Sequence, residues 1–206
     1  MRLVPEERFL ALYLSLRDAV EKTMALPGPT ALPGPTAPPG PTAPPGSAAP
    51  PGSAAPLGQW AIVGVKRGGA ILAQRMWKDL QPSHPGLEYG EVDISLYRDD
   101  YHLQVGNPRV LGTEISFPVD GRSIFLVDDV LFTGRTIRAA MDQLLDFGRP
   151  RRIWLAVLID RGHRELPIAA NFVGHTVSTN PQDRVVVLWR ELGESVDAVD
   201  LIPGGA

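Results

Sequence analysis

Short apolar runs alternate with amphipathic segments after residue 59. The runs at 60–65, 124–127 and 153–159 are almost wholly apolar, which is typical of strands buried on both faces. Two following segments place apolar residues at helical spacing, the first with Leu72, Ala73, Met76, Trp77 and Leu80 and the second with Ile137, Ala140, Met141 and Leu144. This order predicts an α/β fold with a mostly parallel sheet flanked by helices.

Other segments carry weaker signals. Residues 91–97 alternate, with Val92, Ile94 and Leu96 on one side, and predict an edge or half-exposed strand. Residues 172–173 and 185–188 predict two more short strands, and the acidic residues that follow are expected to add little. Residues 1–25 predict an amphipathic helix, because charged residues are spread among the apolar positions. A signal peptide or a membrane span would need an uninterrupted apolar run.

A segment without charged side chains, residues 26–58, separates this helix from the rest of the chain. It repeats every six residues and contains 12 of the 21 prolines. Glycine recurs at every sixth position, whereas a collagen triple helix needs it at every third. The composition predicts a disordered Pro/Gly-rich insertion that acts as a linker, with docking of a proline motif as the alternative. The expected organisation is an N-terminal helix (1–25), the linker (26–58) and one domain (59–206).

Composition narrows the classes of function. The 206 residues suit a single domain, and a net charge of −3 gives no overall attraction to nucleic acid or anionic lipid. The absence of cysteine excludes disulfides, thiolate metal sites and a cysteine nucleophile, and a cytoplasmic location is expected. The four histidines show no metal-ligand spacing, so no metal site built from side chains is expected.

Polar residues follow the three predicted buried strands, at 66–69, 128–129 and 160–163. In parallel sheets, ligands bind at the carboxyl ends of the strands. These three segments are therefore expected to converge on one site.

The strongest chemical signal lies at residues 124–136. Asp128 and Asp129 follow four apolar residues, and Thr133, Gly134 and Thr136 then lead into a helix. Amide groups at a helix N-terminus, a flexible glycine and threonine hydroxyls suit a phosphate, while paired carboxylates suit sugar hydroxyls with magnesium nearby. The pattern predicts a phosphoribosyl site, and the plainer alternative is that these residues only cap the helix. Walker and dinucleotide-binding glycine motifs are absent.

This segment resembles the signature that binds 5-phosphoribosyl 1-diphosphate (PRPP) in type I phosphoribosyltransferases. Together with residues 64–76, 91–100, 123–174 and 185–199, it resembles the PyrR family of pyrimidine-operon attenuation regulators and uracil phosphoribosyltransferases. The resemblance implies the type I phosphoribosyltransferase fold with a small hood, and conversion of uracil and PRPP to UMP and diphosphate with Mg²⁺. It also implies a homo-oligomer, a dimer or higher, and binding of pyrimidine-operon leader RNA.

The resemblance also assigns roles to residues. Asp128, Asp129 and Arg98 form the catalytic set, and Arg98 begins a flexible loop that closes over the reaction. A hood around the base comprises Asp160, Arg161, Gly162 and His163, of which His163 is expected to be structural or to face RNA. The PRPP-binding residues are Lys66, Arg67, Gly68, Asp128, Asp129, Val130, Leu131, Phe132, Thr133, Gly134, Arg135 and Thr136.

Two other functions remain open at this point. One is a non-catalytic regulator that senses nucleotide and binds RNA, and the other is a purine-type phosphoribosyltransferase. The first helix bears on the RNA function, because residues 14–18 read Leu-Ser-Leu-Arg-Asp where the PyrR family usually has Thr-Arg-x-x-His. An anion that replaces a cation near RNA phosphates predicts weak RNA binding.

Overall fold

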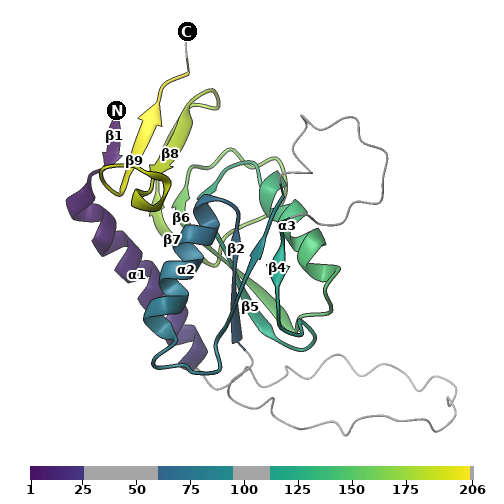
Figure 1. The fold of residues 1–206 in the computed structure, drawn as a ribbon. Helices are drawn as coiled ribbons and strands as arrows, with labels where there is room; N and C mark the ends of the chain where they lie inside the picture. Colours follow the sequence, from purple (N-terminus) through teal and green to yellow (C-terminus); the bar gives the residue numbers. More distant parts are fainter. Residues whose placement is uncertain (26–59, 95–111, 205–206) are drawn as a thin grey trace, which may run out of the picture.

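The computed structural model describes residues 1–25, 60–94 and 112–204, whose arrangement is shown in Figure 1. Strands and helices follow one another along the described chain in this order: β1 (Arg2–Val4), α1 (Glu6–Ala25), β2 (Trp60–Val65), α2 (Gly68–Leu80), β3 (Glu88–Val92), β4 (Glu114–Ile115), β5 (Ser123–Leu131), α3 (Arg135–Leu145), β6 (Arg152–Asp160), β7 (Phe172–Thr176), β8 (Arg184–Leu188), a short 3-10 helix (Arg190–Leu192) and β9 (Ala198–Ile202).

Two expected features lie outside the described residues, namely the linker at 26–58 and the loop that begins at Arg98. The helix predicted for residues 1–25 forms as α1, and the short strand β1 precedes it. None of the helices in the described ranges is both long enough and apolar enough to cross a membrane.

The main sheet contains six strands in the order β4, β3, β2, β5, β6 and β7. All neighbouring pairs run parallel except β3 and β4, which run antiparallel. The strands predicted to be buried, β2, β5 and β6, are adjacent in the middle of this sheet. The α/β fold with a mostly parallel sheet is therefore confirmed, and the carboxyl ends of these three strands lie at the same edge.

Both faces of the main sheet are covered by helices, which explains the continuous apolar runs. Ile62 of β2 packs in the core that includes the buried side chains of α1 and α2. Its neighbours Ala61 and Val63 point to the opposite core, which includes the buried side chains of α3. Figure 1 shows this division, with α1 and α2 on one side of the sheet and α3 on the other.

Three strands differ from the prediction. β5 has nine residues rather than four, because its pairing with β6 continues as far as Leu131. Of the strand predicted at 91–97, residues 95–97 lie outside the described residues; β3 spans Glu88–Val92, and its outer edge is covered by the two-residue β4. The C-terminal residues, expected to add little, form β9, which pairs with β8 and β1 in a separate three-stranded sheet. That expectation was wrong because pairing between distant strands leaves little local signal.

Arg75 of α2 connects the two sheets. Its guanidinium binds both carboxylate oxygens of Glu191, at 2.7 and 2.6 Å, and contacts Asp197 at 2.9 Å. The hydrogen bond from Arg75 holds the pKa of Glu191 below its usual value. Burial alone would raise the pKa of Asp197, but Arg75 outweighs this effect and the pKa is lowered. Both carboxylates therefore favour the folded state while they are charged.

We expect Arg75→Met to lower the free energy of unfolding by about 2 kcal/mol at pH 7, because charge-assisted hydrogen bonds are lost. A carboxylate with a lowered pKa contributes above its unfolded pKa of about 4 and loses this contribution as the pH falls through the folded value. The difference between wild type and variant should therefore shrink from pH 7 to pH 3, as measured by denaturant unfolding. The control Arg2→Met removes an exposed ion pair with Asp200 and should cost below about 0.5 kcal/mol. An equal loss at both pH values would contradict this role of Arg75.

Candidate active site

The structure brings the three polar segments together at the carboxyl edge of the main sheet. The loop after β2 packs against β5, since a side-chain carbon at Gly69 would lie 2.5 Å from the carbonyl oxygen of Val127. The loop after β6 is tied to the end of β5 by a hydrogen bond of 3.1 Å from Arg161 N to Leu131 O. Segments that are far apart in the sequence thus form one continuous surface around the paired acids.

Asp128 and Asp129 lie inside β5 and not beyond its end. Asp128 is 6 % exposed, and its Oδ1 accepts a hydrogen bond of 2.9 Å from the backbone N–H of Asp129. Burial raises the pKa of Asp129, whereas Asp128 and Trp189 lower it. A carboxylate that has lost part of its hydration gains from hydroxyl donors supplied by a ligand.

Gly68, the first residue of α2, allows the chain that follows β2 to approach Asp129 closely. A side-chain carbon at Gly68 would lie 1.9 Å from Asp129 Oδ2 and 2.5 Å from Asp129 Cγ, so any other residue would displace this carboxylate. A carbon added at the neighbouring Gly69 would lie 2.8 Å from the Cα of Asp128. The two glycines are therefore needed for close contact between the loop and the acids.

The turn at the start of α3 has the conformation expected of a phosphate site. Gly134 adopts φ +93° and precedes the helix, and no side chain caps the helix N-terminus. The hydroxyl of Thr133 accepts a hydrogen bond of 3.3 Å from Arg135 N. The first turn contains no acidic residue, so its remaining amide groups and the nearby Thr136 hydroxyl suit an anion. The segment Val130–Leu131–Phe132 connects the acids to this turn.

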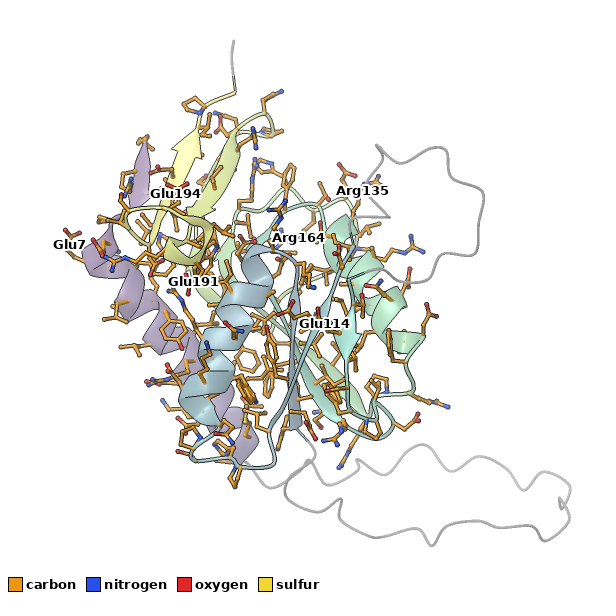
Figure 2. All side chains as sticks on the ribbon, in the orientation of Figure 1. Glu7, Glu114, Arg135, Arg164, Glu191 and Glu194 are labelled. Atoms are coloured by element: carbon orange, nitrogen blue, oxygen red, sulfur yellow. The ribbon has the colours of Figure 1, made fainter. Side chains whose placement is uncertain are left out.

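The two basic residues after β2 have different surroundings. Lys66 Nζ donates to Gly112 O at 2.5 Å and lies 3.2 Å from Glu91 and 3.4 Å from Glu114, which is labelled in Figure 2. Burial acts to lower the pKa of Lys66, but these carboxylates outweigh it and raise the pKa. Arg67 is exposed and has no ion pair within the described ranges. Its cation is therefore available to a ligand, while that of Lys66 is already neutralised.

The loop after β6 contains the predicted hood residues. The Arg161 side chain is 4 % exposed and donates to Asp183 O at 2.6 Å and Asn180 O at 2.8 Å, with its guanidinium 4.0 Å from the ring centre of Phe132. Burial lowers the pKa of Arg161. These contacts place Arg161 in the framework of the hood, where it supports the segment before β8.

Asp160, Gly162 and His163 occupy the same loop. Asp160 accepts hydrogen bonds from Gly162 N at 2.9 Å and from Arg164 at 2.5 Å. His163 is exposed, adopts φ +57°, and its Nε2 lies 2.8 Å from the carbonyl oxygen of Thr179. Gly162 and His163 therefore present backbone and ring atoms on the outer side of the loop.

Arg164 has a larger role than its sequence position suggests. Its guanidinium donates to Phe132 O at 2.6 Å and to Gly162 O at 3.0 Å, besides its contact with Asp160. Figure 2 shows Arg164 and Arg135 near the start of α3, and Arg135 pairs with Glu165 at 2.7 Å across the same loop. The sequence does not indicate whether an arginine in a polar loop points inward, so it did not predict this role of Arg164.

Arg98, the remaining predicted catalytic residue, lies outside the described residues. Within the described ranges, no group of three or more histidine or acidic side chains could hold a metal ion. The acids at the carboxyl edge are thus a pair of carboxylates near the turn that begins α3.

Comparison with known proteins shows the class to which this chain belongs. The phosphoribosyl transferase domain family matches residues 53–187. Among solved structures, a hypoxanthine phosphoribosyltransferase from Staphylococcus aureus superimposes with a TM-score of 0.60 at 17% identity, covering 97% of this chain and 90% of the other. A hypoxanthine-guanine phosphoribosyltransferase from Bacillus anthracis gives a TM-score of 0.57 at 14% identity, covering 90% and 85%. The chain has the phosphoribosyltransferase fold.

More similar sequences identify the family within this class. The bifunctional protein PyrR of Roseiflexus sp. is 51% identical over 143 residues, which cover 69% of this chain and 78% of that protein. The PyrR proteins of Chloroflexus aurantiacus and Listeria monocytogenes are 49% identical over 146 residues (70% and 80% covered) and 48% identical over 143 residues (68% and 78% covered). The chain belongs to the PyrR family of type I phosphoribosyltransferases.

Arg67 and Lys66 are expected to contribute differently to the binding of diphosphate. Arg67→Gln should weaken binding of inorganic diphosphate in the presence of Mg²⁺ by about tenfold or more, because a charged hydrogen bond contributes ~1.5–3 kcal/mol. Lys66→Met should change the affinity by less than about threefold, since Glu91 and Glu114 already neutralise that cation. Isothermal titration calorimetry of both variants measures the difference. A larger loss for Lys66→Met than for Arg67→Gln would refute this division of roles.

Proposed function

We propose that this protein is a uracil phosphoribosyltransferase of the PyrR type, which converts uracil and PRPP to UMP and diphosphate. The observation that carries this proposal is the close approach of three loops at one sheet edge, with Asp128 and Asp129 between an uncapped helix N-terminus and the glycine pair. Membership of the PyrR family supports the choice of uracil over a purine base.

In this proposal, each part of PRPP binds a different group of residues. The turn from Thr133 to Thr136 receives the 5′-phosphate, because its amides and hydroxyls donate hydrogen bonds to an anion. Asp128 and Asp129 accept hydrogen bonds from the ribose hydroxyls. The loop formed by Lys66, Arg67 and Gly68 receives the diphosphate, with Arg67 supplying the charge.

The paired acids also fit Mg²⁺ bound together with PRPP. Mg²⁺ is commonly held through one or two carboxylates plus substrate phosphates, and Asp128 and Asp129 offer two carboxylates beside the proposed diphosphate loop. The ion would supply positive charge to offset the negative charge of the leaving diphosphate.

The chemistry follows from this placement. The bond between ribose C1′ and the diphosphate oxygen breaks early, and diphosphate leaves with the bonding electrons. A ring nitrogen of uracil forms the new bond to C1′ and releases its proton to solvent. Positive charge develops on the ribose while it is held at Asp128 and Asp129, and Arg67 lies where negative charge develops on diphosphate. Positioning and electrostatic stabilisation thus account for the reaction without a covalent nucleophile.

The base is placed in the hood. Gly162 and His163 lie on the outer side of the loop after β6, and Asp160, Arg161 and Arg164 hold that loop in place. His163 is assigned a structural or positioning role, since its ring already contacts the backbone of Thr179. Arg98, carried over from the family resemblance, belongs to a loop that closes over bound PRPP and excludes water.

We further infer that the protein acts in the cytoplasm as a homo-oligomer, a dimer or higher. Both inferences follow from its membership of the PyrR family. Their tests are fractionation of cells and sedimentation analysis of the purified chain.

Asp129→Asn tests the proposed activity. Turnover of uracil and PRPP should fall by at least about tenfold, because a charged hydrogen bond to the ribose is worth ~1.5–3 kcal/mol. Asp128→Asn should behave similarly, and Asp146→Asn at the exposed end of α3 serves as a matched control with unchanged turnover.

Labelled PRPP offered with uracil, hypoxanthine or guanine identifies the base in the same assay. Product from uracil alone supports the proposal. Product from a purine base would make this a purine-type enzyme, and no product from any base would make it a nucleotide-binding regulator. Wild-type turnover in both aspartate variants would overturn the assignment of the acids to the ribose.

We propose that a second function, regulation through binding of pyrimidine-operon leader RNA, is reduced in this protein because its RNA binding is weak. Arg17 of α1 pairs with Asp18 at 2.5 Å and with Asp79 at 3.5 Å, so its charge is already neutralised. Asp18 is half exposed and would repel RNA phosphates. The protein is therefore expected to retain enzyme activity and nucleotide binding but to bind RNA weakly.

A gel-shift titration with the protein's own operon leader and UMP tests this second function. We expect weak binding with a shallow dependence on salt, because each lost cation–phosphate contact removes one released counterion. Measurements at two salt concentrations give the slope. Tight binding that falls steeply with salt would show that another surface supplies the cations and that the regulatory function is complete.

A further inference from the structure

Trp189, which follows β8, carries a buried polar group that the proposed mechanism does not use. The residue is 1 % exposed, and its indole Nε1–H has no hydrogen-bond partner among the residues that the structure describes. Buried N–H groups are nearly always paired, because an unpaired donor has lost water without replacement. The direction of this N–H therefore needs an explanation.

The indole nitrogen lies beside the Asp129 carboxylate. Trp189 Nε1 is 3.1 Å from the position that a side-chain carbon at Gly68 would occupy, and Asp129 Oδ2 is 1.9 Å from the same position. The indole nitrogen, the carboxylate and Gly68 therefore meet at one point. The effect of Trp189 on Asp129 is to lower the pKa of the carboxyl, as expected of an N–H donor that faces it.

Surrounding side chains restrict the orientation of the indole ring. Phe9 of α1 packs edge-on against it, with ring centres 5.4 Å apart and an angle of 89° between the rings. The Arg75 guanidinium lies 5.0 Å from the ring centre and is itself held by Glu191 and Asp197. Rotation of the ring would disturb both contacts, so the N–H has a defined direction.

We propose that Trp189 is a positioning residue whose indole N–H holds the Asp129 carboxylate in the orientation that the ribose hydroxyls require. This inference rests on the proposed function, in which Asp129 contacts the ribose. The indole N–H is a neutral donor, so it can orient the partly buried Asp129 carboxylate through a hydrogen bond. It adds no positive charge that would compete with the ligand for this carboxylate. Small adjustments on PRPP binding would bring the N–H and carboxylate into full hydrogen-bond geometry.

This geometry also gives the three-stranded sheet a part in the active site. Trp189 directly follows β8, and the ion pairs of Arg75 fix the segment after it. The C-terminal sheet therefore sets the position of a donor that faces an acid on β5. A tryptophan that served only as core packing would not require its indole nitrogen to lie beside the Asp129 carboxylate.

Trp189→Phe removes the N–H and retains most of the aromatic packing. We expect its dissociation constant for PRPP with Mg²⁺ to rise by about tenfold, as for loss of a hydrogen bond to a charged group. Trp77→Phe is the matched control, because the indole Nε1–H of Trp77 on α2 donates to Leu87 O at 2.9 Å and not to an acid of the proposed site. The control should leave the dissociation constant within about twofold of wild type.

A double-mutant cycle with Asp129→Asn separates positioning from packing. If Trp189 acts through Asp129, Trp189→Phe should have little further effect on PRPP affinity once Asp129 is replaced. Equal effects in both backgrounds would overturn the inference while leaving the proposed function intact. A normal PRPP affinity in Asp129→Asn alone would instead overturn the proposed function.

NMR spectroscopy of the wild-type protein tests the same inference even if Trp189→Phe does not fold. In ¹⁵N-labelled wild-type protein, the indole N–H resonance of Trp189 should shift downfield when PRPP and Mg²⁺ bind, because a hydrogen bond to the Asp129 carboxylate forms. The indole resonance of Trp77 should remain in place. A Trp189 resonance that does not respond to PRPP would contradict the inference.

Discussion

The parallel pairing of β5 with β2 and β6 is the interaction on which the rest of the structure depends. Val127 of β5 is in register with Gly64 on one side and with Ala156 on the other. Parallel strands end at the same edge, so this register brings three loops to one place although up to about a hundred residues separate them in the chain. The hydrogen bonds of the strands therefore decide where phosphate, ribose and base can meet.

Close packing at that edge then limits the residues that the site can contain. Gly68 and Gly69 bring backbone against Asp128 and Asp129, and the acids lose water as a result. The cost of a partly dehydrated carboxylate favours hydroxyl donors from a ligand and explains why a neutral N–H from Trp189 stands nearby. The same burial that raises the pKa of Asp129 thus favours a ligand with hydroxyl donors, as in the proposed ribose site.

The hood and the C-terminal sheet are held to this edge by arginines with different functions. Arg161 and Arg164 bind backbone carbonyls of neighbouring loops, and Arg75 binds the carboxylates that follow β8. A guanidinium presents several donors in fixed directions, so a single side chain can satisfy carbonyls from separate segments. Arg67 differs from these because it stays exposed, which leaves its charge for a ligand.

The sequence by itself determined the α/β class, the three buried strands and the turn from Thr133 to Thr136, because hydrophobic periodicity, glycine and hydroxyl residues act over a few neighbouring positions. It also indicated the pairing of Asp128 and Asp129. The tertiary structure decided that Lys66 is neutralised by Glu91 and Glu114, that Arg161 is buried in the hood, that β9 pairs with β8, and that Trp189 lies beside Asp129. These features depend on contacts between residues far apart in the chain, and the orientation of a charged side chain follows from the partners that folding places beside it.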